Sequence, residues 1–99
     1  MSHIDKIQGV ERLMQALLDL NTKEECHALL EDICTIKEVQ DIAQRLEVCF
    51  MLDEGKNYQE ISKATGASTA TISRVKKCLV YGSGGYRTAL DRAKEEGEK

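Results

Sequence analysis

Apolar residues recur every three or four positions through most of the chain, which is the spacing of one face of an α-helix. This pattern predicts six helices, at residues 3–20, 23–33, 36–54, 58–64, 69–80 and 86–96. The glycine-rich stretch 82–85 between the last two is expected to be a flexible joint. We therefore expect an all-α fold, formed by one small helical domain that contains residues 1–99.

Polar residues that can cap helices mark where several of these helices begin. An acid follows three residues after each of four such residues, which is the pattern of a capping box: Ser2, Thr22, Thr35 and Asn57. Ser68 fits the same role without the acid, and Gly55 is placed to end the third helix in the left-handed conformation.

The fourth and fifth helices are joined only by Thr65-Gly66-Ala67, which is short enough for the turn of a helix-turn-helix. Gly66 is expected where the backbone takes a positive φ. A small shared core would hold the two helices at a steep angle, and its residues are Ile61, Ala67, Ile72 and Val75. The alternative is a helical hairpin that merely packs, because short motifs also arise by chance.

The helix after this turn begins with short side chains, which allow close entry into a DNA major groove. Hydroxyl groups there can meet base edges or phosphates, and Ala70 can meet a thymine methyl. Lys63, Lys76 and Lys77 would flank the site and contact phosphates. The sequence thus predicts DNA contacts from Lys56, Gln59, Lys63, Ser68, Thr69, Ala70, Thr71, Ser73, Lys76 and Lys77.

The charge distribution supports this interpretation, although the net charge of the chain is −3. Residues 1–55 carry a net −7, whereas residues 56–81 carry five basic side chains against Glu60 alone. Residues 82–99 are balanced. A basic segment in an acidic chain is typical of a surface that binds a polyanion, with a solvated helix surface as the alternative.

Composition and length bear on assembly. The chain has no proline or tryptophan and only 4% aromatic residues, which favours helices. A domain of 99 residues buries only roughly 60–65% of the surface of its unfolded chain, so its core is thin. The broad apolar stripe of the first helix therefore suggests a homodimer, although an ordinary core-facing stripe has the same pattern. We assign residues 1–55 to dimerisation, 56–81 to the helix-turn-helix and 82–99 to a hinge and C-terminal helix.

Other classes of protein have little support. No apolar run is long enough for a membrane span, and the N-terminus does not resemble a signal peptide, so we expect a cytoplasmic protein with reduced cysteines. No two cysteines have the spacing of a zinc site, and Cys26, Cys49 and Cys78 are expected in the core, so we predict no metal. No catalytic motif is present, and we expect neither an enzyme nor a required cofactor.

Residues 66–74, Gly-Ala-Ser-Thr-Ala-Thr-Ile-Ser-Arg, resemble the start of the recognition helix in the Trp repressor superfamily. The resemblance runs from about Thr35 to Arg74, is weaker on either side, and is greatest to the YerC/YecD-type branch. It implies an intertwined, all-helical homodimer that presents two recognition helices to an operator.

The resemblance also implies a ligand site. Arg45 and Arg74 match the two arginines that flank the bound tryptophan in the Trp repressor. However, Val75 stands where that family has a glycine that makes room for the indole, and Cys78 replaces the hydroxyl that receives the amine. We therefore expect no tryptophan binding. Arg45 and Arg74 could hold a smaller anion, or they could be structural.

Taken together, these patterns predict a sequence-specific DNA-binding transcriptional regulator, a repressor, whose partners are double-stranded DNA and a second copy of the chain. The alternative is a helical protein–protein interaction module that uses the acidic N-terminal half, with the helix-turn-helix as scaffold only.

Overall fold

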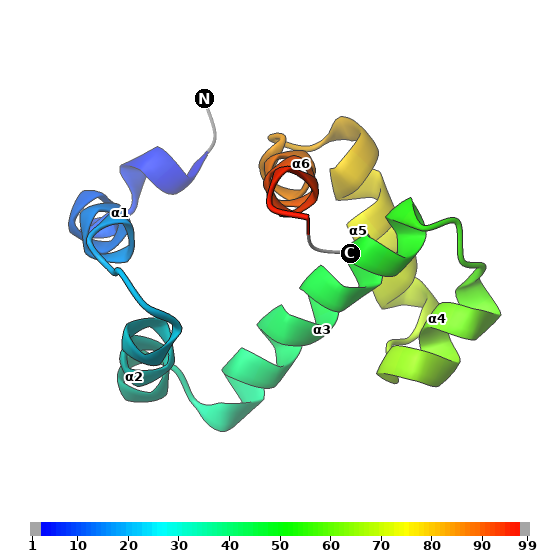
Figure 1. Ribbon diagram of the computed structural model, residues 1–99, viewed down its shortest axis with the longest axis horizontal. Coiled ribbons are helices and arrows are strands. Elements are labelled where there is room, and N and C mark those ends of the chain that lie inside the picture. The colour runs from blue at the N-terminus through cyan, green and yellow to red at the C-terminus, as the bar shows by residue number, and fades with distance from the viewer. Residues whose placement is uncertain (1–2, 98–99) are drawn as a thin grey trace. The chain divides into compact units, whose positions relative to one another are not determined.

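The computed structural model describes residues 3–97, in which every regular element is a helix (Figure 1). In chain order the elements are η1 (His3–Lys6), α1 (Val10–Leu18), α2 (Lys23–Ile33), α3 (Ile36–Asp53), α4 (Tyr58–Thr65), α5 (Thr69–Tyr81) and α6 (Gly85–Glu95). The predicted all-α class is confirmed. The packing divides the chain into two compact units, Met1–Val39 and Gln40–Lys99, and the division falls inside α3.

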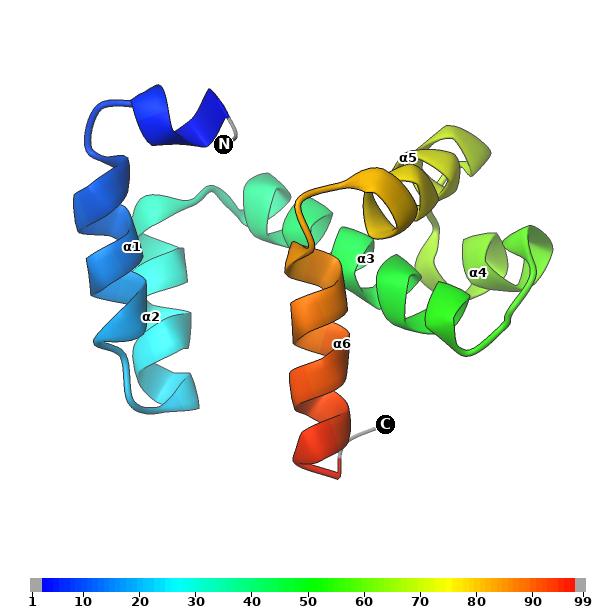
Figure 2. The ribbon, with the colours of Figure 1, turned by 90° about the horizontal axis from the view of Figure 1, so that it is seen from above.

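In the first unit, α1 and α2 run side by side in opposite directions (Figure 2). The expectation of one continuous helix from residue 3 to residue 20 is wrong. The 3-10 helix η1 ends at Lys6, and Gly9 then takes a φ of 87° before α1 begins. A positive φ suits glycine and cannot continue a right-handed helix. Ser2, the expected cap of that helix, lies outside the described residues.

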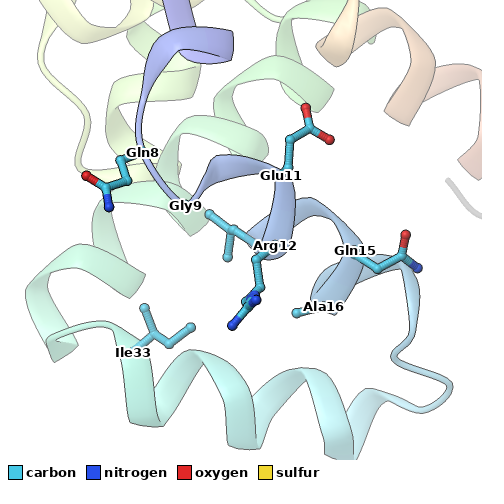
Figure 3. Close-up of a pocket in the computed structure, with 8 residues that line it drawn as sticks. Gln8, Gly9, Glu11, Arg12, Gln15, Ala16 and Ile33 are labelled. Atoms are coloured by element: carbon cyan, nitrogen blue, oxygen red, sulfur yellow. The ribbon is translucent and has the colours of Figure 1, made fainter.

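The described part of the first unit buries little of its own apolar surface, since Val10 alone falls in the buried class. Nine large apolar side chains of this unit are exposed, namely Ile4, Ile7, Leu13, Met14, Leu17, Leu18, Leu30, Ile33 and Ile36. A hollow of about 840 Å³ lies along α1, and Figure 3 shows Arg12 on α1 and Ile33 on α2 at its edges. Many exposed large apolar side chains in one small unit are typical of a surface that packs against another molecule.

The second unit contains the main core. Each of its helices contributes to one buried cluster, formed by Val48, Cys49, Ile61, Ala67, Ile72, Val75 and Leu90. The contacts of α5 with α4 and with α6 place α5 at the centre of this unit. The core therefore fixes the helix that carries the predicted DNA contacts.

The helix starts follow the predicted caps. Thr35 and Asn57 each accept a hydrogen bond from the backbone N–H three residues on, and Glu38 and Glu60 accept from the capping residue in return. Thr22 accepts from the Glu25 N–H at 3.0 Å, but the Glu25 carboxylate accepts from Asn21, one residue earlier than a capping box requires. The bounds of α2 to α6 agree with the predicted ones to within one residue.

Candidate nucleic-acid interface

The helix-turn-helix predicted within residues 56–81 is formed by α4, a short turn and α5 (Figures 1 and 2). Gly66 has a φ of 76°, as expected, and its N–H donates to the Ser62 carbonyl at 2.8 Å. Ala67, directly after it, is buried and its N–H donates to the Thr65 hydroxyl at 3.1 Å. These bonds satisfy the backbone of the turn, so that the chain reverses direction within three residues.

The four predicted core residues of this motif are all buried, with at most 2% of any of them exposed: Ile61, Ala67, Ile72 and Val75. The turn is also tied to α3, because Gln44 Nε2 donates to the Thr65 carbonyl oxygen at 3.0 Å. The role of Gln44 could not be predicted from the sequence, because its partner lies 21 residues away along the chain.

The first turn of α5 is capped and open to solvent. The Ser68 hydroxyl oxygen accepts from the Thr71 N–H at 3.1 Å, and the two hydroxyl groups are also hydrogen-bonded to each other. The predicted recognition residues of α5 that are exposed are Ser68, Thr69, Ala70, Ser73, Lys76 and Lys77. Thr71 differs, since it is half-buried and faces a cavity on the other side of the helix.

The cations near the motif are exposed. Gln59 and the lysines predicted to contact DNA, namely Lys56, Lys63, Lys76 and Lys77, are all solvent-accessible. Within residues 3–97, none of these lysines, nor Arg74, forms an ion pair with a carboxylate. Lys76 instead places its Nζ over the ring of Tyr58, 6.0 Å from the centroid. The positive charge of this region is therefore not neutralised by the described part of the chain.

Arg45 and Arg74 both line a cavity of about 230 Å³, together with Thr71, Val75, Cys78 and Tyr86. Burial raises the pKa of Tyr86, and the two nearby guanidinium groups oppose that shift by stabilising its anionic form. The structure thus brings together the two arginines predicted to lie at one site. Tyr86, which α6 contributes, had no signal in the sequence.

A comparison with known protein families decides the identity of this fold. The model of the family described as Trp repressor protein matches residues 8–94. This chain belongs to the Trp repressor family. It is 55% identical over 94 residues to the uncharacterized protein YerC of Bacillus subtilis (strain 168), with 93% of this chain and 90% of YerC covered.

Two solved structures share the fold of this Trp repressor family member. A candidate Trp repressor from Staphylococcus aureus matches with a TM-score of 0.88 and 42% identity over 95% of this chain and 96% of that chain. A TrpR-like protein from Eubacterium eligens ATCC 27750 matches with a TM-score of 0.84 and 48% identity over 88% and 90%. The resemblance to the YerC-type branch is thus confirmed, and the Trp repressor family is one of helix-turn-helix DNA-binding regulators rather than enzymes.

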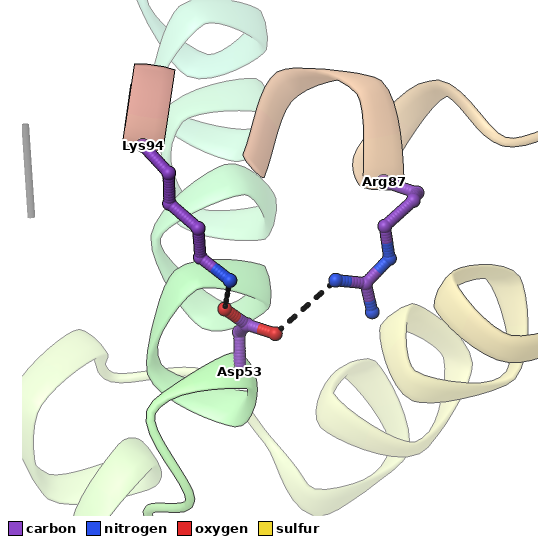
Figure 4. Close-up of polar contacts among 3 residues, drawn as sticks. All are labelled: Asp53, Arg87 and Lys94. Atoms are coloured by element: carbon purple, nitrogen blue, oxygen red, sulfur yellow. Dashed lines mark hydrogen bonds and ion pairs between the residues drawn. The ribbon is translucent and has the colours of Figure 1, made fainter. Parts of the chain in front are cut away.

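This member of the Trp repressor family holds α6 in place with charges that the sequence did not reveal. Asp53, the last residue of α3, accepts from Lys94 Nζ at 3.1 Å and from Arg87 Nη1 at 3.4 Å (Figure 4). The hydrogen bond and charge of Lys94, and then those of Arg87, lower the pKa of the Asp53 carboxyl. Asp53 thereby links α3 to both ends of α6.

The cysteines of this Trp repressor family member divide differently from expectation. Cys49 is buried as predicted, and burial raises the pKa of its thiol. The core placement predicted for Cys26 and Cys78 is wrong, since both are exposed: Cys26 lies on the sparsely packed first unit, and Cys78 opens to the cavity.

Within residues 3–97, no three His, Cys, Asp or Glu residues are grouped as a metal site requires. The same residues include no helix that is long and apolar enough to cross a membrane.

Proposed function

We propose that this protein is a sequence-specific, double-stranded-DNA-binding transcriptional repressor that acts in the cytoplasm as a homodimer. One observation carries the proposal: α5 presents short side chains at an exposed, capped first turn, and the lysines around it lack carboxylate partners among the described residues. Unpaired lysines release counterions from DNA phosphates, and short polar side chains can approach base edges.

The assigned roles follow from this arrangement. Lys56, Lys63, Lys76 and Lys77 contact phosphates and set the affinity, whereas Ser68, Thr69, Ala70 and Ser73 read base edges, with Gln59 beside them. Thr71 connects the two surfaces, because its hydroxyl oxygen binds Ser68 while its side chain faces the cavity.

The homodimer is supported by the first unit. Nine large apolar side chains between η1 and the start of α3 remain exposed. Burying them against a second copy would add the core that the unit lacks. Two copies would also present two recognition helices to one operator.

A small-molecule site is a second proposal for the cavity beside α5. Two guanidinium groups, Arg45 and Arg74, line it and attract an anion, while Val75 and Cys78 restrict its width and its polar contacts. We propose a small anionic ligand there rather than tryptophan.

The main test is DNA affinity as a function of salt. Oligonucleotides selected from a random pool are titrated with the wild-type chain, and then with Lys76→Ala and Lys77→Ala. Each variant should weaken binding to all sequences alike and reduce the slope of log affinity against log salt by about one unit for each lysine–phosphate interaction removed. Thr69→Ala should instead change the preferred sequence.

Arg92→Ala is the matched control, because Arg92 is an exposed cation of α6 that is paired with Glu95 and lies outside the proposed face. The slope of log DNA affinity against log salt should be the same for Arg92→Ala as for the wild type. A wild-type chain that binds no oligonucleotide would favour the protein–protein interaction module. If neither Lys76→Ala nor Lys77→Ala changed DNA binding, the DNA-binding surface would lie outside α5.

A further inference from the structure

We propose that Tyr58 is a positioning residue for DNA binding, and that its ring holds the Lys76 ammonium group where a DNA phosphate meets it. The inference rests on the proposed DNA-binding function. It adds a residue that does not itself contact base or phosphate.

The contact joins the start of α4 to the second half of α5. Tyr58 is the first residue of α4, Lys76 lies in the second half of α5, and Lys76 Nζ is 6.0 Å from the centroid of the Tyr58 ring. Within the described residues, Lys76 has no carboxylate partner. The ring is thus the interaction that restricts this side chain.

Tyr58 is itself held firmly. Its side chain is half-buried and packs against the core cluster of the second unit. Its backbone follows a complete capping box, in which Asn57 and Glu60 exchange two hydrogen bonds of 2.8 and 2.9 Å. A ring fixed at both backbone and side chain offers a defined surface for a cation.

An aromatic ring suits this purpose better than an acid would. A carboxylate would neutralise Lys76 and compete with the phosphate, whereas the face of a ring attracts an ammonium group and leaves its charge intact. A free lysine has a long, flexible side chain whose ordering opposes binding. Restricting Lys76 before DNA arrives removes part of that cost.

Lys77 provides an internal control. It follows Lys76 on the same helix, carries the same charge and is exposed, but no ring contact is found for it in the described part of the chain. If Tyr58 acts through Lys76, removing the Tyr58 ring should weaken DNA binding only while Lys76 is present and charged. The same loss should occur whether or not Lys77 is charged.

The experiment is a double-mutant cycle on DNA affinity at fixed salt. Tyr58→Leu should weaken binding about two- to fivefold, the range of an exposed cation–π contact, and Tyr58→Phe, which keeps the ring, should remain within about twofold of wild type. In a Lys76→Met background Tyr58→Leu should cause no further loss, whereas in a Lys77→Met background the full loss should persist.

Equal losses in both backgrounds, or no loss from Tyr58→Leu, would overturn the role of Tyr58 while leaving DNA binding intact. A wild-type chain that binds no DNA would instead overturn the proposed function and this inference with it. A measurement on the wild-type chain alone does not depend on the folding of any variant: the Lys76 ε-methylene protons should resonate upfield of those of Lys77. Coincident resonances would also overturn the inference.

Discussion

Val75 lies where the core of the helix-turn-helix meets the cavity beside α5. Only 2% of it is exposed, because it packs with Ile61 and Ile72 in the core cluster. The same side chain forms part of the cavity wall next to Arg74 and Cys78. The size of this one residue therefore bears on both the packing of α5 and the space left for a ligand.

We predict that L-tryptophan does not bind to this protein. An indole would have to displace a packed, β-branched Val75, and such overpacking costs roughly 1–3 kcal/mol, which is one to two powers of ten in affinity. Cys78 offers the ammonium group only a weak acceptor. Calorimetric titration should detect no binding to the wild type, and Val75→Gly should gain affinity under conditions where it remains folded. Micromolar binding to the wild type would refute this prediction.

The residues of this cavity show what the sequence could and could not reveal. Thr71, Arg74, Val75 and Cys78 recur at helical spacing, so their shared face could be predicted. Tyr86 could not, because it reaches the cavity from α6 across a glycine-rich connection. Tyr58 and Gln44 were likewise invisible, since their roles depend on contacts between helices rather than on spacing within one.

At the scale of elements, the ends of helices depend on groups close by in the chain and can be predicted well from the sequence. Breaks inside an apolar stripe cannot be predicted in this way. Thr35 and Asn57 cap α3 and α4 as predicted, because their partners lie three residues away. Gly9 interrupts the first predicted helix even though Ile7 and Val10 keep helical spacing around it. A glycine within a stripe permits a break but does not require one.

The turn between α4 and α5 should depend on the backbone of Gly66. A Cβ at this position would be 3.9 Å from Gln44 Nε2, an ordinary contact, so the strain of Gly66→Ala comes from its φ of 76°. We expect a loss of about 1–2 kcal/mol in the free energy of unfolding, measured by urea denaturation. Gly85→Ala is the control, because Gly85 is helical with open space around it, and its stability should be unchanged or raised by up to about 1 kcal/mol.

The attachment of α6 should depend on pH through Asp53. Its pKa is lowered by Lys94 and Arg87, so the ionised form stabilises the fold. This contribution is present above the ordinary aspartate pKa of about 4 and is lost as the pH falls below it. Asp53→Asn should lower the free energy of unfolding at pH 7 by up to about 1 kcal/mol. The variant should also lose less stability than the wild type as the pH falls below about 4.

Glu54→Gln is the control for Asp53, since Glu54 is the exposed neighbouring acid without an ion pair among residues 3–97. Its urea unfolding should match the wild type at both pH 7 and pH 3. An Asp53→Asn variant as stable as the wild type at pH 7 would mean that the α5 contacts of α6 suffice to hold it.

At the scale of the whole molecule, the two units differ in how well they stabilise themselves. The second unit has seven of the eight buried residues found within residues 3–97, whereas the first has Val10. The sequence suggests this imbalance through the broad apolar stripe of residues 3–20. It does not reveal the division after Val39, because α3 continues through it without a change in periodicity.

We expect sedimentation equilibrium at micromolar concentration to give twice the chain mass of 11.1 kDa. Leu17→Ala should raise the dimer dissociation constant about 30-fold or more, because truncating a leucine that becomes buried costs at least about 2 kcal/mol. Asp19→Ala is the control, since Asp19 ends the same helix outside the hollow and its truncation removes an exposed hydrogen bond from Gln15. A stable, folded monomer at this concentration would exclude the homodimer.

The continuity of α3 limits where this chain can be shortened. Its packing changes from one unit to the other after Val39, but its hydrogen bonding begins at Thr35, about one helical turn earlier. A fragment that started at Gln40 would leave the first N–H groups of its leading helix without the Thr35 cap, at a cost of about 1 kcal/mol. A fragment of the second unit should therefore start before Thr35 and retain a short piece of the first unit.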